Sequence, residues 1–329
     1  MPEPSVSRPV SDCSKPLLIQ EVAPRDGFQI ESRFIPTAEK IALIDALSFC
    51  GLAKIEVTSF TSAKAIPALA DADEVMRGIR RQPGVVYTAL VPNVRGAERA
   101  IAAGTDELNL VMSASETHNL LNLRMTREQS RVRLLEVVDL AKSSGVALNL
   151  SLSASFGCPV EGVVPEGEVL RLVEHFLGRG VAGITLCDTT GMAHPGQVTA
   201  LSRAFRSRFP EVALTLHLHN TRGMGLANAL AGVEAGVVRF DASLGGLGGC
   251  PYAPGATGNV CTEDLVHMLQ AMGHRLEVDL PRLLAAARTL PSMVGHDLPG
   301  QVLHAGRSQD LNPAPANLEE IRARAAGQH

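Results

Sequence analysis

His217 and His219, separated by one residue, are the side chains whose types and spacing point most directly to chemistry in this chain. They end the apolar run Leu-Thr-Leu-His-Leu-His at residues 214–219. Successive side chains of a β-strand point to opposite faces, so both imidazoles would project from one face and supply half of a metal site. Two histidines hydrogen-bonded inside a barrel would give the same pattern, so further ligands are needed to decide.

Polar side chains also stand within or just after several other apolar runs. They are Arg25 and Asp26, Glu56, Ser113 and Ser115, Asp188, and the loop at residues 245–259. Singly, each has a simpler interpretation: Arg25 and Asp26 suit a surface turn, and Glu56 suits an ion pair inside a barrel. Asp188 suits a turn or a helix cap. Their joint occurrence favours a common site.

Four of these residues form a donor set for a divalent cation. Asp26, His217, His219 and Asn259 offer two oxygen atoms and two imidazole nitrogens, a combination suited to Mg²⁺ or Mn²⁺. Water and substrate oxygens would complete six-coordination. Zinc fits an oxygen-rich set less well.

The loop Gly-Gly-Leu-Gly-Gly-Cys-Pro-Tyr-Ala-Pro-Gly at residues 245–255 is rich enough in glycine to move and to approach a ligand closely. Cys250 lies at its centre. Unpaired cysteines are usually small buried hydrophobes, which a polar glycine loop does not explain. We therefore expect the loop to act as a lid and Cys250 to act in proton transfer or gating.

The elements that would position these residues are eight apolar runs alternating with eight helical patterns. The expected strands are residues 17–23, 54–58, 85–91, 106–112, 146–152, 183–187, 213–219 and 237–243. The expected helices are residues 37–50, 67–81, 94–103, 126–144, 166–179, 196–209, 223–235 and 262–271. Near-continuous apolar strands are typical of parallel strands buried on both faces, and their alternation with helices predicts a (β/α)8 barrel.

Glycine follows five of these helical patterns, where a left-handed helix end favours it. The residues are Gly51, Gly104, Gly145, Gly180 and Gly236. A doubly wound open sheet is the alternative, but its first strand would usually precede a glycine-rich phosphate turn, whereas residues 24–27 read Pro-Arg-Asp-Gly. In a barrel, the loops after the strands build the active site, so the polar residues above would converge on one mouth.

Composition indicates a globular, enzyme-like body. Hydrophobic residues make up 45% and charged residues 19% of the chain, enough for a large core. A net charge of -4 and 3% aromatic residues argue against a nucleic-acid partner. Six cysteines without a CxxC pair, and the lack of a leader-like or membrane-length apolar run, predict a reduced, cytoplasmic protein with no membrane partner.

Three segments are expected. Residues 1–16 would form a flexible N-terminal arm, residues 17–299 the catalytic barrel, and residues 300–329 a C-terminal tail. The stretch from residue 280 onward, rich in Pro, Ala and Arg, predicts one or two helices beyond the eighth barrel helix and a mobile end.

Five stretches closely resemble the 3-hydroxy-3-methylglutaryl-CoA (HMG-CoA) lyase family, and the resemblance spans residues 17–299. The stretches are Glu-Val-Ala-Pro-Arg-Asp-Gly-Phe-Gln (21–29), Ile-Glu-Val-Thr-Ser-Phe (55–60), His-Leu-His (217–219), Gly-Gly-Leu-Gly-Gly-Cys-Pro-Tyr (245–252) and Gly-Asn (258–259). The cysteine loop is that family's signature. Isopropylmalate and homocitrate synthases and pyruvate carboxyltransferases share the Arg-Asp step and the His-x-His strand but not this loop.

The resemblance implies a role for each matched residue. Asp26, His217, His219 and Asn259 would hold the cation, with Glu56 supporting the site. Arg25 would act on the thioester carbonyl, and Cys250 would close over the substrate. Asp26 is our candidate base and Cys250 our candidate acid, with metal-bound water as the competing acid. The residues expected to bind substrate are Arg25, Gln29, Ser59, Ser113, Asp188 and Thr189.

The implied reaction is metal-dependent cleavage of HMG-CoA to acetyl-CoA and acetoacetate, as in leucine degradation and ketone-body formation, by a homo-oligomer. The chain departs from the family's usual motif at Ala23, Phe28 and Ile30, where glycine, leucine and asparagine are common. These changes spare the ligands but could reshape the acyl pocket. A lyase for another 3-hydroxyacyl-CoA is therefore one alternative. A Claisen-type acyltransferase is another, disfavoured by the cysteine loop and by the short stretch after residue 299.

Overall fold

Eight parallel strands close into a barrel in chain order, which confirms the predicted fold class. The computed structural model describes residues 15–249 and 258–327. The strands are β1 (Leu18–Glu21), β2 (Lys54–Ser59), β3 (Val86–Leu90), β4 (Glu107–Ser113), β5 (Ala147–Ser153), β6 (Gly183–Asp188), β7 (Ala213–Leu218) and β8 (Arg239–Ala242). β8 pairs with β1 from Leu18↔Arg239 to Glu21↔Ala242, which closes the ring.

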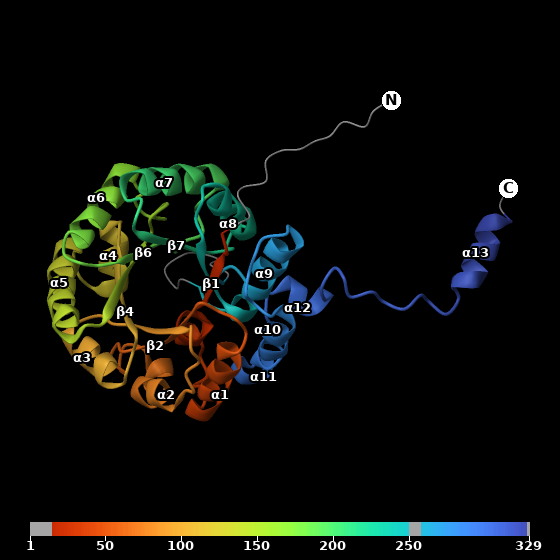
Figure 1. Ribbon diagram of the computed structural model, residues 1–329, viewed down its shortest axis with the longest axis horizontal. Coiled ribbons are helices and arrows are strands. Elements are labelled where there is room, and N and C mark those ends of the chain that lie inside the picture. Colours follow the sequence, from red (N-terminus) through yellow and green to blue (C-terminus); the bar gives the residue numbers. More distant parts are fainter. Residues whose placement is uncertain (1–14, 250–257, 328–329) are drawn as a thin grey trace.

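Helices form a ring around the sheet (Figure 1). They are α1 (Thr37–Ser48), α2 (Ala72–Gly78), α3 (Val94–Ala102), α4 (Glu116–Leu123), α5 (Arg127–Ser144), α6 (Glu166–Leu177), α7 (Pro195–Arg208), α8 (Gly225–Glu234) and α9 (Thr262–Ala271). No helix of the described segments is long and apolar enough to span a membrane.

Two predictions for the barrel helices differ from the structure. The helix expected at residues 67–81 is divided into a 3-10 turn, η3 (Pro67–Leu69), and the shorter α2. At the break, the carboxylate of Asp71 accepts hydrogen bonds from Thr37 and Lys40 of α1 instead of capping α2. The second difference is α4, an additional helix in the loop after β4.

The predicted glycine helix ends are confirmed. Each of the five glycines has a positive φ, as a left-handed helix end requires. They are Gly51 (77°), Gly104 (84°), Gly145 (69°), Gly180 (100°) and Gly236 (83°).

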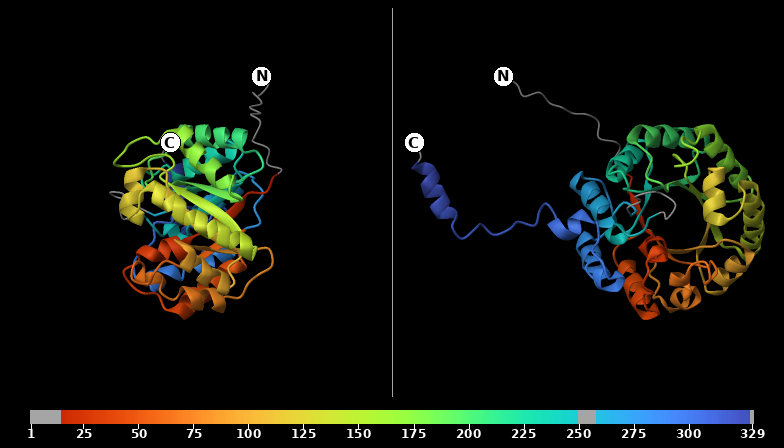
Figure 2. Two further views of the ribbon diagram at one scale, coloured as in Figure 1. Left: turned by 90° about the vertical axis from the view of Figure 1, so that its left-hand side faces the viewer. Right: turned by 180° about the vertical axis from the view of Figure 1, so that it is seen from behind.

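After α9 the described residues form four helices, more than the one or two predicted, because two of them are only five residues long: α10 (Leu280–Ala287), α11 (Leu290–Val294), α12 (Gln301–Ala305) and α13 (Leu318–Ala326). The Asp264 carboxylate of α9 accepts the backbone N–H groups of Gln301 and Val302, which holds α12 on the barrel. By contrast, α13 has no buried residue and stands away from the barrel, as Figure 1 and the right-hand view of Figure 2 show. The domain division at residue 299 stays a prediction.

Glu21, at the end of β1, links the first strand to the chain that follows β8. Its Oε1 accepts the N–H groups of Ala23 (2.8 Å) and Leu244 (2.9 Å), and its Oε2 accepts the Thr262 hydroxyl (2.8 Å). Burial raises the pKa of Glu21 to about 8, although these hydrogen bonds act in the opposite direction. The folded protein therefore favours the protonated carboxyl.

This raised pKa predicts how stability depends on pH. The ordinary pKa of this carboxyl is 4.5. The contribution of the protonated Glu21 to the free energy of unfolding is fully present below about pH 4.5 and is lost as the pH rises through about 8. In Glu21→Gln, Oε1 can still accept both N–H groups and the amide can donate to Thr262, but the side chain cannot ionise. Melting temperatures measured by circular dichroism from pH 6 to pH 9 should therefore fall less steeply for Glu21→Gln than for the wild type. Equal slopes would contradict this role.

Candidate active site

Arg25 and Asp26 lie on a π-helical turn, η1 (Ala23–Gly27), that directly follows β1. Pro24 stands in the first turn, where its missing N–H is not needed, and the N–H of Asp26 donates to the carbonyl of Val22 at 2.7 Å. Both side chains are turned into the barrel mouth and buried, with 8% of Arg25 and 9% of Asp26 exposed. The surface-turn interpretation of this step is therefore wrong.

Asp26, His217 and His219 bring their donor atoms together, within 4.8 Å of one another. The Nε2 atoms of the two histidines lie 3.2 Å apart, and Nε2 of His217 lies 3.8 Å from Oδ2 of Asp26. Neighbouring ligands of an octahedral ion with bonds of about 2.1 Å are about 3.0 Å apart. Two imidazole lone pairs this close repel unless a proton or a cation lies between them, so the residues present fit a divalent ion.

Asn259 completes the set. It forms an isolated β-bridge with His219, and its Nδ2 donates to Oδ2 of Asp26 (2.7 Å) and to the carbonyl of Leu247 (3.0 Å). Its Oδ1 is buried and has no hydrogen-bond partner among the described residues. A buried amide oxygen without a partner costs free energy, and a bound cation would remove that cost.

The charges around the donor atoms favour a cation. Burial opposes ionisation of Asp26, but Arg25, the two histidines and the amide of Asn259 together lower its pKa to about 2. Burial and the charges of His217 and Arg25 lower the pKa of His219 to about 3. Asp26 is therefore an anion and His219 a neutral imidazole with an available lone pair at neutral pH.

Arg25 is held by a second carboxylate. Its Nε donates to Oε2 of Glu56 at 2.6 Å, and its Nη1 pairs with Asp26. Burial disfavours the guanidinium, but Asp26 and Glu56 outweigh that effect and raise the pKa of Arg25, which stays charged. The prediction of an arginine partner for Glu56 agrees with this pair. Since Arg25 compensates Glu56, a divalent cation would balance the charge of Asp26.

Hydrogen bonds inside the barrel continue from this pair. Oε1 of Glu56 accepts from Asn109 of β4 at 2.7 Å, and Oδ1 of Asn109 accepts from Asn149 (3.0 Å) and Ser151 (2.9 Å) of β5. Asn149 also donates to Thr185 of β6 at 3.0 Å. This network fixes the carboxylate of Glu56 and, through it, the guanidinium of Arg25.

Two of the predicted substrate-binding residues, Ser59 and Thr189, lie at or just after strand ends and have local hydrogen bonds. Ser59, at the end of β2, pairs with the hydroxyl of Thr61 at 2.8 Å. Thr189 accepts the N–H of Ala154 at 3.2 Å, and Gln29 lies partly buried on the 3-10 turn η2 (Phe28–Ile30). Their role in binding substrate stays a prediction.

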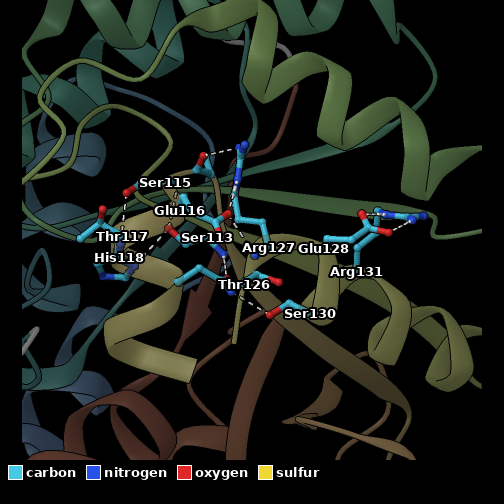
Figure 3. Close-up of polar contacts among 12 residues, drawn as sticks. Ser113, Ser115, Glu116, Thr117, His118, Thr126, Arg127, Glu128, Ser130 and Arg131 are labelled. Atoms are coloured by element: carbon cyan, nitrogen blue, oxygen red, sulfur yellow. Dashed lines mark hydrogen bonds and ion pairs between the residues drawn. The ribbon is translucent and has the colours of Figure 1, made fainter. Parts of the chain in front are cut away.

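Ser113 and Ser115 organise the end of β4 (Figure 3). The hydroxyl of Ser115 accepts the N–H of His118 at 3.1 Å and thereby caps α4. Ser113 accepts the N–H of Ser115 at 3.2 Å and lies 3.1 Å from Nδ1 of His118. Ser113 is almost fully buried, so any contact with substrate would come from the inner side of this turn.

The two carboxylate oxygens of Asp188, at the end of β6, have different surroundings. Its Oδ1 accepts the N–H groups of Met192 (2.8 Å) and Ala193 (3.0 Å), as the turn interpretation predicts. Its Oδ2 is buried without a hydrogen-bond partner in the described parts of the chain. Burial raises the pKa of Asp188 to about 7, a value at which a carboxyl can donate or accept a proton near neutral pH.

Gly248, in the described start of the glycine loop, lies against the donor set. A Cβ on Gly248 would lie 2.5 Å from Nδ2 of Asn259 and 3.3 Å from Oδ2 of Asp26, so only glycine fits there. Cys250 lies outside the described residues, and its role stays a prediction.

Two residues of the site escaped the sequence prediction. Asp241 of β8 lies 3.2 Å from Nδ1 of His217, and Asn109 supports Glu56. Each is a polar residue within an otherwise apolar strand, which could have indicated a site. The local sequence does not predict which residue it contacts.

The closed barrel and the histidine–carboxylate cluster at its mouth define a (β/α)8 enzyme with a donor set for a divalent metal. The chain matches the model of the HMGL-like family over residues 17–290 and belongs to this family. Its similarity to hydroxymethylglutaryl-CoA lyases assigns it to the carbon–carbon lyases.

Individual relatives cover nearly the whole chain. A hydroxymethylglutaryl-CoA lyase of Bacillus subtilis is 45% identical over 89% of this chain and 98% of its own length. An (R)-citramalyl-CoA lyase of Chloroflexus aurantiacus is 41% identical over 88% and 94%, respectively. The structure of an HMG-CoA lyase from Acinetobacter baumannii with coenzyme A and 3-methylmalate is 52% identical, with a TM-score of 0.88 over 91% of this chain and 98% of that one.

Proposed function

We propose that this chain cleaves HMG-CoA between C2 and C3 to give acetyl-CoA and acetoacetate, with Asp26, His217, His219 and Asn259 holding a divalent cation. The observation that carries the proposal is the convergence of these donors beside the charged Arg25, in a chain similar to hydroxymethylglutaryl-CoA lyases over most of its length. Mg²⁺ or Mn²⁺ suits two oxygen and two imidazole donors completed by water and substrate.

The reaction needs a base, a stabilised enolate and an acid. When bound, the cation would bind the substrate hydroxyl and make it more acidic. Asp26, an anion beside that position, accepts the hydroxyl proton; the C2–C3 electron pair then moves onto the thioester as an enolate while C3 becomes a ketone. Arg25 donates hydrogen bonds to the thioester oxygen where negative charge develops. Glu56 keeps the guanidinium in place.

Cys250 is our candidate for the acid that protonates C2 of the enolate. Cys250→Ala should lower kcat by about 10²-fold with little change in KM, because loss of a positioned acid affects the transition state more than substrate binding. The measurement is the steady-state rate of acetyl-CoA release. Cys50→Ala is a matched control, since Cys50 is buried at the end of α1 and donates to the carbonyl of Ala46. Wild-type kcat in Cys250→Ala would exclude this role.

A lyase for a related 3-hydroxyacyl-CoA is the second candidate, favoured by the (R)-citramalyl-CoA lyase relative and by Phe28 and Ile30 in the motif. Phe28 is fully buried, whereas 43% of Ile30 is exposed, so Ile30 is the better candidate for a direct effect on substrate. The test compares kcat/KM for HMG-CoA and (R)-citramalyl-CoA, whose acyl group is one methylene shorter. Higher kcat/KM for HMG-CoA supports our assignment, and the reverse order replaces it.

We further propose that the protein is a homo-oligomer in the cytoplasm and that its partner is the acyl-CoA substrate. Sedimentation equilibrium of the purified chain measures the oligomeric state, and a concentration-independent monomer mass would contradict that part of the proposal.

A further inference from the structure

Asp241 is a carboxylate next to the candidate metal ligands but outside the ligand set. It stands on β8 directly opposite His217 in the β7–β8 register. Its Oδ2 lies 3.2 Å from Nδ1 of His217, and the two side chains are only 11% and 9% exposed. The contact therefore joins two nearly solvent-free polar groups on neighbouring strands.

The two ring nitrogens of His217 face different surroundings. Nδ1 faces Asp241, whereas Nε2 lies 3.2 Å from Nε2 of His219 and 3.8 Å from Oδ2 of Asp26. An ionised carboxylate can only accept a hydrogen bond, so the proton of a neutral His217 belongs on Nδ1. The lone pair of Nε2 is then directed into the donor cluster, where a cation would need it.

The charge of Asp241 acts on the same cluster. Asp241 shares the wall of a small cavity with Glu56, the partner of Arg25, and with Asn109. The guanidinium of Arg25 is already paired with Glu56 and Asp26. The negative charge of Asp241 is thus available to the histidine and to a cation bound by it.

We propose that Asp241 is a positioning residue that fixes the ring of His217 with Nε2 toward the ligands and thereby strengthens divalent-cation binding. The proposal rests on the proposed function in one respect, namely that His217 is a ligand. Ligand histidines commonly donate their second N–H to a carboxylate, and loss of that carboxylate typically weakens metal binding by about 10- to 100-fold.

The test is titration of the metal-free full-length protein with Mn²⁺, with free Mn²⁺ measured by electron paramagnetic resonance. Asp241→Asn keeps an acceptor oxygen but loses the charge, and we expect it to weaken binding about 10-fold; Asp241→Ala loses both and should weaken it about 100-fold. At saturating Mn²⁺, kcat of Asp241→Asn should return to within a few-fold of the wild type. Asp45→Asn is the matched control, because Asp45 lies on the outer helix α1 and accepts hydrogen bonds from Arg80. Its Mn²⁺ affinity should not change.

The outcomes separate this role from the metal site itself. The positioning role would be overturned if both Asp241 variants bound Mn²⁺ as tightly as the wild type while His217→Ala bound it more weakly. That result would leave the metal site itself supported. Failure of the wild type to bind Mn²⁺ would overturn both. If Asp241→Ala does not fold, as judged by circular dichroism, Asp241→Asn decides alone.

Discussion

Replacing Asp26 with asparagine is expected to lower the rate of acetyl-CoA release from HMG-CoA by about 10³-fold, within the range that a positioned base contributes. Asparagine has nearly the same shape and can still contact Asn259, but it removes the anion that Arg25, His217 and His219 stabilise. The change thus removes both the candidate base and a charged cation ligand. The measurement is kcat from a coupled assay at saturating substrate and over a range of Mn²⁺ concentrations.

Two results separate these contributions. Weaker Mn²⁺ binding alone would let high Mn²⁺ restore kcat, whereas loss of the base would leave kcat low at every Mn²⁺ concentration. We expect the second result. Asp45→Asn is a control for replacing a buried aspartate, because Asp45 lies near the end of α1 and accepts hydrogen bonds from Arg80. Near-wild-type kcat in Asp26→Asn would eliminate Asp26 as the base.

Replacing Arg25 with methionine is expected to raise the barrier by about 3 to 4 kcal/mol, the usual effect of removing one preorganised donor to a developing oxyanion. This corresponds to a loss of about 10²- to 10³-fold in kcat, with a smaller effect on KM. The positive charge of Arg25 faces Asp26 and Glu56 from inside a nearly water-free mouth, where such a charge acts strongly.

Methionine at position 25 would leave Glu56 buried without its partner, which can destabilise the fold. Arg25→Met combined with Glu56→Gln removes that problem, since glutamine can keep the hydrogen bond from Asn109. Arg25→Lys keeps the charge but not the forked donors, and it should recover only part of the lost rate. Full activity in the folded double variant would show that Arg25 does not stabilise the enolate.

The strands and most helices were predictable because their signals are local. α9 begins and ends where its apolar pattern predicts, at Thr262 and Ala271, and β7 differs from its prediction only at His219. Glycine caps such as Gly145 depend on a single backbone conformation. Ser115 could have indicated α4, because serine is a common helix N-cap, but eight residues are too few for a clear apolar period.

The shape of the site depends on contacts between distant residues. The ligand set could be proposed because the strand ends of a parallel barrel meet at one mouth. The convergence of Asp26 with His217 and His219 agrees with this expectation. The π-helical turn that carries Arg25 inward has no such signal, and neither has the pairing of His217 with Asp241, which follows from the register of β7 and β8. Sequence patterns specify faces and ends, whereas hydrogen-bond partners require the closed barrel.

The most direct test of the central proposal is release of acetyl-CoA from HMG-CoA by the purified full-length chain, measured with Mg²⁺ or Mn²⁺ and again after a chelator. We expect cleavage at an ordinary enzymatic rate with either ion, loss of activity with the chelator, and recovery when the ion is returned in excess. Unchanged cleavage in the presence of the chelator would contradict the metal-dependent mechanism. No cleavage by protein that binds Mn²⁺ at the Asp26, His217 and His219 cluster would contradict HMG-CoA as the substrate.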